Sequence, residues 1–459
     1  MFSIAFLVVF TLALIVANVY CFKKKNYLTL FIPCMLFLPD YYGIDLSESL
    51  PILSVTRIMF VVFYVYAVIN RKRNLHIKEI DLKRIPKVYL FLAGYFLFRI
   101  TSNLYYVTTY GQSVKTILKI VFEQLFLLLA FYLLKPTKSE IDKMIKAIVG
   151  AAAVLFVVGV FESVSGIRIF DSLYTVSRSV GNLTATRLGL LRATTTMIMP
   201  GFFGNMCVMV LPLIFYLYEE TKNFAYVLVA ALDVLATIHS GARSDMIFIL
   251  VITVVYLLFV IKSSKRRLVF CRTMLIVTGV LLIYIIGVSA VSDDLRYYYV
   301  GNGKAVLNEF GFEFNLDEGA PKGSGGYGGN LNGTVSRTRQ LTGMYYVAGI
   351  NPIFGLGSGA QIRGDVLYYW PYSKGDLWSA VNTYDMGIVE IFCDEGLIGL
   401  LGICFLFIYM IIKAKNSHFY WFLIFCYLLA TLNTANMIPF LMLFVILISQ
   451  NSKICVGNN

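Results

Sequence analysis

The sequence predicts an all-α polytopic membrane protein. The chain is 58% hydrophobic and only 14% charged, and apolar runs of about 20 residues recur, the length that crosses a hydrocarbon core of about 30 Å. Lys and Arg are concentrated in alternate short connections between these runs, which is typical of proteins that cross a membrane repeatedly. The net charge of +13 therefore reflects orientation in a membrane, and nucleic acid is not an expected partner.

The apolar runs predict about twelve or thirteen transmembrane helices. The first run lacks a basic start and a small-residue cleavage site, so we predict a retained helix and not a signal peptide. The last block is broken by Asn433-Thr434-Ala435-Asn436, and either two spans or one span with a re-entrant turn would fit. No repeat or linker divides the chain, so residues 1–459 are predicted to form one membrane domain. The predicted spans are 2–22, 27–39, 51–69, 86–101, 114–134, 146–162, 198–218, 223–239, 246–261, 273–291, 386–412 and 418–450.

Basic residues in the short connections fall on one side of the predicted spans, and the positive-inside rule makes that side cytoplasmic. The N-terminus and the long polar segment 292–385 are then expected outside the cytoplasm. The basic connections contain Lys23–Lys25, Arg71–Lys87, Lys135–Lys146, Lys222, Lys262–Arg272, Lys413, Lys415 and Lys453.

The segment 292–385 is the one long polar stretch of the chain. Its length of about ninety residues exceeds what a connection needs. It contains Trp370, Trp378 and many tyrosines, so we predict one large ordered extracytoplasmic loop and not a disordered linker. Its glycine-rich run from Gly319 to Gly329 is interpreted as a mobile lid, with an inert flexible insertion as the alternative.

Acidic residues cluster where this segment returns to the membrane. One of them could deprotonate an acceptor hydroxyl, whereas solvated surface positions are the default for most. They are Asp365, Asp376, Asp385, Glu390, Asp394 and Glu395.

Several basic residues lie near the outer ends of the predicted spans, where the positive-inside rule disfavours them. For Arg57 and Arg99 the alternative to a functional role is snorkelling to lipid headgroups. Lys115, Lys119 and Glu123 are spaced i, i+4, i+8 and share one helical face. The two lysines are candidate substrate-binding residues, and a structural Lys119–Glu123 ion pair is the alternative.

Arg187, Arg192 and Arg243 are the strongest candidates for an anion site. They lie in polar surroundings at the predicted outer mouths of helices. A guanidinium group can donate paired hydrogen bonds to a phosphate, so several of them at a membrane edge favour an anionic group carried by a lipid. His239 is the one histidine expected at the outer face. It is a candidate substrate-binding residue, with a satisfied polar end-group as the alternative.

Other familiar site chemistry has no support in the sequence. The eight cysteines lie in or beside apolar spans and form neither a CxxC pair nor a zinc pattern. The sequence contains no GxSxG, HExxH or P-loop motif, because Lys322 lacks the P-loop spacing. ATP-driven transport is therefore not predicted.

At residues 185–402 the sequence resembles the O-antigen polymerase and O-antigen ligase family of bacterial membrane glycosyltransferases. The resemblance depends on the order and spacing of short motifs placed around a large external loop. The motifs are Arg192 with Pro200-Gly201-Phe202-Phe203-Gly204-Asn205; His239-Ser240-Gly241-Ala242-Arg243-Ser244; Arg337 and Arg339; Asn351-Pro352-Ile353-Phe354-Gly355-Leu356-Gly357-Ser358-Gly359; Asn382-Thr383-Tyr384; and Glu395-Gly396-Leu397-Ile398-Gly399.

The resemblance implies a glycosyltransferase C-like architecture in the bacterial cytoplasmic membrane. It implies an enzyme without metal or cofactor that transfers a glycan from undecaprenyl diphosphate to an acceptor hydroxyl outside the cytoplasm. Family arginines hold the diphosphate, and the matching positions here are Arg192, Arg243, Arg337 and Arg339. Asn382 and Tyr384 are expected to contact substrate. The implied partners are the lipid-linked donor and acceptor, membrane lipid and a regulator of chain length.

One position departs from the family pattern. Many ligase-like members carry a histidine directly before the Asn-Thr-Tyr-like segment, whereas this chain has Val381. This favours a polymerase, which joins one lipid-linked repeat unit to another, over a ligase that moves glycan to lipid A core. A non-enzymatic flippase or transporter is the third hypothesis. Against it stand the long external loop and the absence of repeat symmetry between the halves of the chain.

Overall fold

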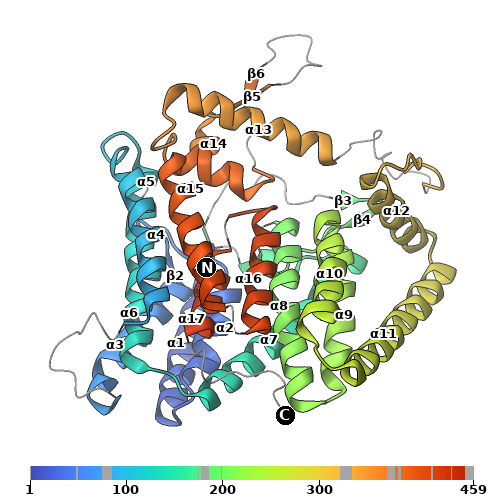
Figure 1. Ribbon diagram of the computed structural model, residues 1–459, viewed down its shortest axis with the longest axis horizontal. Helices are drawn as coiled ribbons and strands as arrows, with labels where there is room; N and C mark the ends of the chain where they lie inside the picture. Colours follow the sequence, from blue (N-terminus) through green and yellow to red (C-terminus); the bar gives the residue numbers. More distant parts are fainter. Residues whose placement is uncertain are drawn as a thin grey trace. The chain divides into compact units, whose positions relative to one another are not determined.

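A computed structural model describes residues 2–47, 50–74, 85–173, 175–176, 186–197, 199–320, 333–369, 378–380, 384–414, 417–435 and 437–449. Figure 1 shows the order of the elements along the chain. Most of the elements are helices, and the only sheets in the described ranges are three two-stranded antiparallel pairs.

The helices and strands are α1 (Phe2–Lys23), α2 (Leu28–Phe37), β1 (Gly43–Ile44), β2 (Leu53–Ser54), α3 (Val55–Asn74), α4 (Lys87–Leu104), α5 (Gly111–Lys119), η2 (Ile120–Leu125), α6 (Phe126–Leu134), α7 (Lys138–Ser165), η3 (Ile169–Leu173), β3 (Thr186–Arg187), β4 (Leu190–Leu191), α8 (Pro200–Thr221), α9 (Ala225–Ser240), α10 (Arg243–Val255), η4 (Tyr256–Val260), α11 (Ser264–Val291), α12 (Asp293–Glu309), α13 (Gly333–Ile350), α14 (Ala360–Arg363), β5 (Leu367–Tyr369), β6 (Trp378–Ala380), α15 (Gly387–Ala414), α16 (His418–Thr431) and α17 (Ile438–Ser449).

Among the described residues, seven helices are long and apolar enough to cross a membrane, and five shorter apolar helices accompany them. Helices suit this environment because all their backbone polar groups are satisfied within one segment. The coarse prediction of an all-α protein with many apolar helices is confirmed. The last predicted block, 418–450, forms two helices, α16 and α17. The stretch predicted at 86–101 is helix α4, which is not among the seven.

The chain divides into two compact units. Unit 1 comprises residues 1–147, 173–177 and 337–455, and unit 2 comprises 148–172, 178–336 and 456–459. Helix α7 begins in unit 1 and belongs to unit 2 from Ile148 onward. The sequence does not signal this division, and the single membrane domain stays a prediction.

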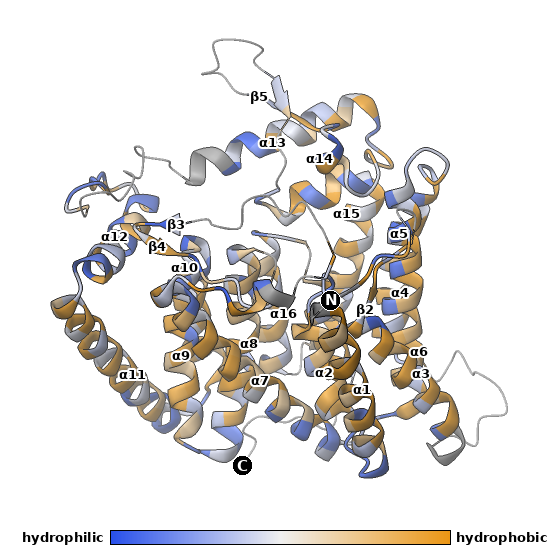
Figure 2. Cartoon of the chain, turned by 180° about the vertical axis from the view of Figure 1, so that it is seen from behind, coloured by the Kyte–Doolittle hydropathy of each residue, from blue (hydrophilic) through white to orange (hydrophobic). Residues whose placement is uncertain are grey.

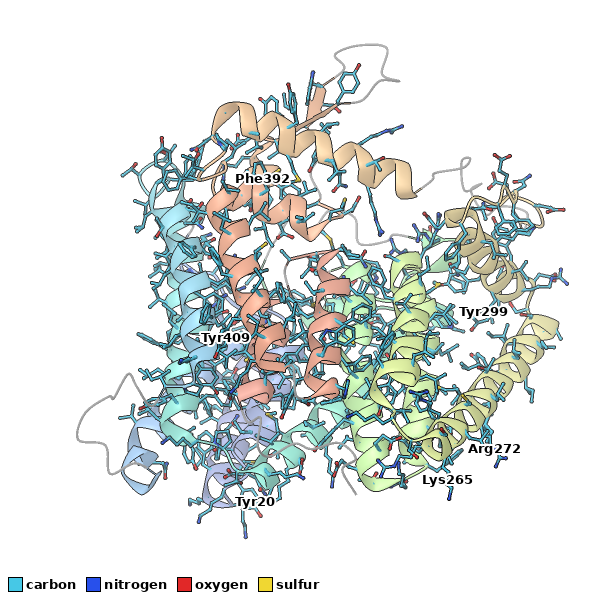
Figure 3. The ribbon with its side chains drawn as sticks, in the orientation of Figure 1. Tyr20, Lys265, Arg272, Tyr299, Phe392 and Tyr409 are labelled. Carbon is cyan, nitrogen blue, oxygen red and sulfur yellow. The ribbon has the colours of Figure 1, made fainter. Side chains whose placement is uncertain are left out.

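Close aromatic packing holds unit 1 together. Phe31 of α2 stacks on Phe63 of α3 with ring centroids 4.1 Å apart. Phe91 of α4 stacks in the same way on Tyr409 of α15, also at 4.1 Å; Tyr409 is labelled in Figure 3. Aromatic side chains bury large apolar areas, so these contacts fix the pairing of the helices.

A turn at residues 352–357 inserts into a kink in α15. Gly396 has φ 67° and ψ −159°, a backbone conformation open essentially to glycine alone. The N–H of Leu397 donates to the carbonyl of Pro352 at 2.8 Å, and the N–H of Leu356 donates to the carbonyl of Cys393 at 2.8 Å. Two of the sequence motifs, 351–359 and 395–399, therefore pack directly against each other.

Helix α8 is the core of unit 2. Of the 18 residues in its most apolar stretch, 83% are buried, and α9 and α10 pack against this helix. Helix α11 is largely uncovered, because only 6% of its most apolar 18-residue stretch is buried. Figure 2 shows α11 hydrophobic along most of its length and hydrophilic near its start. An apolar helix with so little protein cover is suited to contact with lipid.

Some basic residues of the predicted short connections can be placed within each unit. In unit 1, Lys143 near the start of α7 donates to the side chain of Asn26, which follows Lys23–Lys25, at 3.0 Å. In unit 2, Lys265 and Arg272 lie toward the end of α11 that is remote from α12, as Figure 3 shows. Which side of a membrane these ends face stays a prediction.

The long polar segment folds into several short elements. Within 292–385 the described residues form α12, α13, α14, β5 and β6. The hydroxyl of Ser292 accepts from the N–H of Leu295 at 3.4 Å and caps α12, and Asp293 and Asp294 occupy its first turn. Acidic residues there interact favourably with the helix dipole. The predicted lid falls mostly at 321–329, outside the described residues.

Candidate anion site

Arg187 and Arg192 reach the same turn of unit 2, the one that joins α9 to α10. The guanidinium of Arg187 donates to the carbonyl of Gly241. Nε of Arg192 donates to the carbonyl of Ser240 at 2.9 Å. A Cβ added to Gly241 would lie 3.2 Å from Nε of Arg192. The turn therefore needs glycine both for its φ of +63° and for the approach of the two arginines.

A two-stranded hairpin carries these arginines. Thr186 pairs with Leu191 and Arg187 with Leu190 across β3 and β4. Leu188 at the tip has φ +50°, which is rare for a side chain of its kind. Its buried side chain packs on Gly301 of α12, where a Cβ would come within 2.8 Å of Leu188 Cδ1. This contact fixes the hairpin on unit 2, and backbone strain of this sort is concentrated at functional sites.

Arg243 begins α10 directly after the same turn. Its side chain is 9% exposed, and Nη1 donates to Glu309 Oε1 at 3.1 Å. Glu309 is the last residue of α12, so the ion pair joins α10 to α12. Breaking a buried pair by removing one partner leaves an uncompensated charge. Arg243 therefore holds this corner of unit 2 together as well as adding a cation to the turn.

Two further residues of this site were not among the sequence-based candidates. Glu162, near the end of α7, is fully buried, and its Oε2 accepts the N–H of Thr195 at 2.8 Å and of Thr194 at 3.3 Å. Arg168 donates to the carbonyl of Arg192 at 3.5 Å. Both residues support the loop that carries Arg192. Arg168 could have been found by the criterion that selected the others, because it follows the predicted outer end of the span 146–162.

Arg168 has unused hydrogen-bonding capacity. Its Nε and Nη1 are buried and have no partner among the described residues. Oε1 of Glu162 and Oγ1 of Thr195 share that condition. Buried polar groups are nearly always satisfied, so these atoms are candidates to bind water or a polar ligand.

His239 is placed differently from the expectation of an exposed substrate contact. The residue is fully buried, and Nε2 lies 2.8 Å from the hydroxyl of Tyr299. Its ring stacks on Tyr298 with centroids 5.5 Å apart. Its carbonyl accepts the N–H of Ala193 at 2.9 Å, so His239 supports the Arg192 loop from behind. One ring nitrogen is therefore hydrogen-bonded, while Nδ1 is buried without a partner among the described residues.

Tyr298 lies next to the same arginines. Burial raises its pKa to about 12, while a hydrogen bond with Asn302 and the charges of Arg192 and Arg187 oppose the rise. Its hydroxyl donates to the carbonyl of Ile238 at 2.7 Å. Tyr298 therefore remains neutral at physiological pH and ties α12 to the end of α9.

An apolar cavity of about 560 Å³ lies beside these residues in unit 2. It is formed by α9, α10, α11 and α12, and Tyr299, labelled in Figure 3, is part of its wall. Arg243 precedes the cavity residue Met246 by one helical turn, and Glu309 follows the cavity residue Leu307. The lining is Val234, Thr237, Ile238, Met246, Ile249, Ile285, Tyr299, Val300, Asn302, Gly303, Val306 and Leu307.

The predicted cations of unit 1 form a separate network. Nζ of Lys119 lies 3.9 Å from Glu123 and 3.2 Å from Asp40. Arg57 pairs with the same two acids, at 2.6 Å from Glu123 and 3.3 Å from Asp40. The structural ion pair left open by the sequence therefore forms and is extended by Arg57 and Asp40. Lys115 lies one turn before Lys119 and is half-buried.

Arg99 is also paired with an acid in unit 1. Its Nε lies 2.5 Å from Oε1 of Glu395, whose side chain is 4% exposed. This ion pair connects α4 to the residue directly before the kink at Gly396. It adds a polar contact to the aromatic packing of α4 on α15.

The remaining predicted site residues belong to the polar segment of unit 1. Arg337 and Arg339 lie in α13 and are half-buried. Tyr384 donates to Oδ1 of Asp394 at 3.0 Å, and burial together with that carboxylate raises the pKa of the Tyr384 hydroxyl. Asn382 and its neighbour Val381 lie outside the described residues. Arg192 and Arg243 belong to unit 2, whereas Arg337 and Arg339 belong to unit 1.

Comparison of the sequence with models of known protein families and with curated proteins gives no significant match. In the described ranges, no group of three or more His, Cys, Asp or Glu residues is arranged to hold a metal ion.

Proposed function

We propose that the chain is a surface-polysaccharide polymerase of the bacterial cytoplasmic membrane. It transfers a glycan from undecaprenyl diphosphate to a hydroxyl of another lipid-linked repeat unit, on the outer face of the membrane. The observation that supports this proposal is the gathering of Arg187, Arg192 and Arg243 around one turn of unit 2, beside an apolar cavity. A cationic turn and an apolar cavity together suit a ligand with an anionic head and a hydrocarbon tail.

The arginines would act on the leaving group. The acceptor oxygen attacks the anomeric carbon, its proton passes to a base, and the bond between that carbon and the diphosphate oxygen breaks. The electron pair leaves with the diphosphate, and the configuration at the anomeric carbon inverts. Arg192 and Arg243 then stabilise the developing negative charge, as preorganised donors do at other sites of bond cleavage, and Arg187 helps to bind the diphosphate. Guanidinium suits this role because it is always charged and can donate two parallel hydrogen bonds.

The apolar cavity would hold part of the isoprenoid chain next to the diphosphate. Its wall is mostly aliphatic, and the sparsely covered helix α11 contributes Ile285. A carrier lipid could enter beside α11 directly from the bilayer, which would avoid exposing its tail to water.

The proposal includes the finer architecture. A glycosyltransferase C-like arrangement and an extracytoplasmic position for the segment 292–385 follow from the resemblance and from the positive-inside rule. The basic connections, including Lys222 and Lys265, would then face the cytoplasm. Lys115, Lys119, Arg337 and Arg339 stay predictions for substrate contact.

The glycan profile of a deletion strain tests the reaction. Loss of a polymerase leaves acceptors capped by single repeats, and neither Arg192→Ala nor Arg243→Ala restores long chains. The amount of each variant in the membrane is measured alongside, because Arg243 also pairs with Glu309. Loss of a ligase would instead strand long chains on the carrier lipid. An unchanged profile in the deletion strain, with no redundant enzyme, contradicts both enzyme hypotheses and leaves the transporter.

A further inference from the structure

Three aromatic side chains meet in unit 1 where α13 lies against the β5–β6 hairpin. The ring centroids of Tyr346 and Trp378 are 5.7 Å apart, and those of Tyr369 and Trp378 are 5.6 Å apart. All three side chains are half-buried, so each keeps part of its surface exposed. Figure 1 shows the hairpin beside α13.

The register of the hairpin explains which rings stay accessible. Tyr369 pairs directly with Trp378, so both side chains lie on one face of the hairpin. Tyr368 points to the opposite face and is 1% exposed, because its ring packs against Gly343 of α13. The hairpin is thus anchored to α13 by Tyr368, and the face with Tyr369 and Trp378 remains half exposed.

A cation and a hydroxyl lie on the face of α13 that meets this hairpin. Arg339, Thr342 and Tyr346 follow the spacing i, i+3, i+7 and share one side of the helix. The hydroxyl of Thr342 accepts the N–H of Tyr369 at 2.9 Å, which shows that this side faces β5. Arg339 and Tyr346 are separated along the helix axis by about 10 Å, close to the length of two sugar rings.

We propose that Tyr346, Tyr369 and Trp378 form a platform that binds the sugar rings of the glycan, with Arg339 at one end. The inference rests on the proposed function, because a polymerase must hold the glycan as well as the diphosphate. The face of a pyranose ring presents C–H groups with a small positive charge, and these attract the negative face of an aromatic ring. Hydroxyl groups around the sugar rim accept hydrogen bonds from guanidinium N–H donors.

Binding of free oligosaccharide tests the platform separately from catalysis. The probe is the strain's own polysaccharide, cut to one to four repeat units and labelled, added to the full chain in lipid nanodiscs. Trp378→Leu removes the flat ring, and we expect binding to weaken by about tenfold, as loss of one stacking partner does for nucleic acid bases. Trp378→Phe keeps a ring and should retain most of the binding. Tyr345→Ala is the matched control, because Tyr345 is 79% exposed on the same helix but outside the platform.

A second variant keeps the test informative if Trp378→Leu fails to fold. Tyr369→Leu should likewise weaken oligosaccharide binding while leaving heat stability near that of the wild type. In a transfer assay both variants should raise KM for the acceptor and shorten the products, with kcat little changed.

The outcomes for the platform and for the proposed function are distinguishable. Oligosaccharide binding unaffected by Trp378→Leu and Tyr369→Leu, or undetectable in the wild type, overturns the platform even if transfer is normal. Arg243→Ala should abolish transfer without weakening oligosaccharide binding. A third outcome is that the wild type binds oligosaccharide but transfers no glycan, and that Trp378→Leu weakens this binding. That outcome would support the platform and overturn the polymerase proposal.

Discussion

Replacing Gly396 by alanine should strongly destabilise unit 1. The residue has φ 67° and ψ −159°, and imposing that conformation on alanine costs about 1–3 kcal/mol. The new Cβ would lie 2.4 Å from both the N–H nitrogen of Gly355 and the carbonyl oxygen of Ile353. Both are backbone atoms, so relieving the clash costs about 1–3 kcal/mol more. We expect a total loss of about 2–6 kcal/mol.

Heat denaturation of the purified protein measures this loss. Gly396→Ala should lower the midpoint clearly, and it should also weaken the hydrogen bonds from Leu397 and Ile398 to the 352–357 turn. Gly94→Ala is the matched control, because Gly94 is inside helix α4 and a Cβ there has no neighbour within 4 Å. That change should be neutral or stabilise by up to about 1 kcal/mol. Equal midpoints for Gly396→Ala and the wild type would refute the described packing of the turn into α15.

Three further predictions concern the anion site. Glu162→Ala should reduce glycan transfer, measured by product length. Glu162→Gln should largely retain transfer, because glutamine keeps an oxygen that accepts the N–H groups of Thr194 and Thr195. An equal loss of transfer in both variants would contradict a positioning role for Glu162. Arg168→Ala should raise KM for the lipid-linked donor by about tenfold with kcat less affected, as expected for loss of one charge-assisted contact; an unchanged KM would exclude contact with the donor. Because the folded-state pKa of Tyr298 is raised from 10.0 to about 12, its contribution to stability is complete below pH 10 and is lost as the pH rises toward 12. The melting midpoints of the wild type and of Tyr298→Phe should therefore converge between pH 10 and pH 12. A constant difference between the two midpoints over this pH range would contradict the raised pKa of Tyr298.

The helices and their order could be predicted from the sequence because apolar length is a local property. The division of 418–450 into α16 and α17 follows from Asn433-Thr434-Ala435-Asn436, which the sequence already marked as a break. The two compact units could not be predicted in this way. They depend on which helical faces pack together, and one sequence does not contain that information.

The anion site shows the same limit. Arg187, Arg192 and Arg243 were selected from the sequence because basic residues are disfavoured at outer helix ends, and the structure brings all three to the turn at Ser240–Gly241. Whether His239 is exposed or buried depends on the direction of its ring, which the sequence does not show. In the structure the ring is buried against Tyr298 and Tyr299. Similarly, Gly355 and Gly396 lie in separate motifs, and only the folded chain shows that each glycine makes room for the other.

The most direct test of the central claim is lengthening of lipid-linked glycan by the purified chain. The protein is placed in lipid nanodiscs with undecaprenyl-diphosphate-linked repeat units from a deletion strain, and no ion gradient is present. We predict that the wild type makes long products and that Arg192→Ala and Arg243→Ala each lower the rate by about 100-fold or more, as loss of one preorganised donor does elsewhere. Arg272→Ala, which changes a basic residue at the other end of unit 2, should act like the wild type. Lengthening at the wild-type rate by Arg192→Ala and Arg243→Ala, or none by the wild type, would contradict the account.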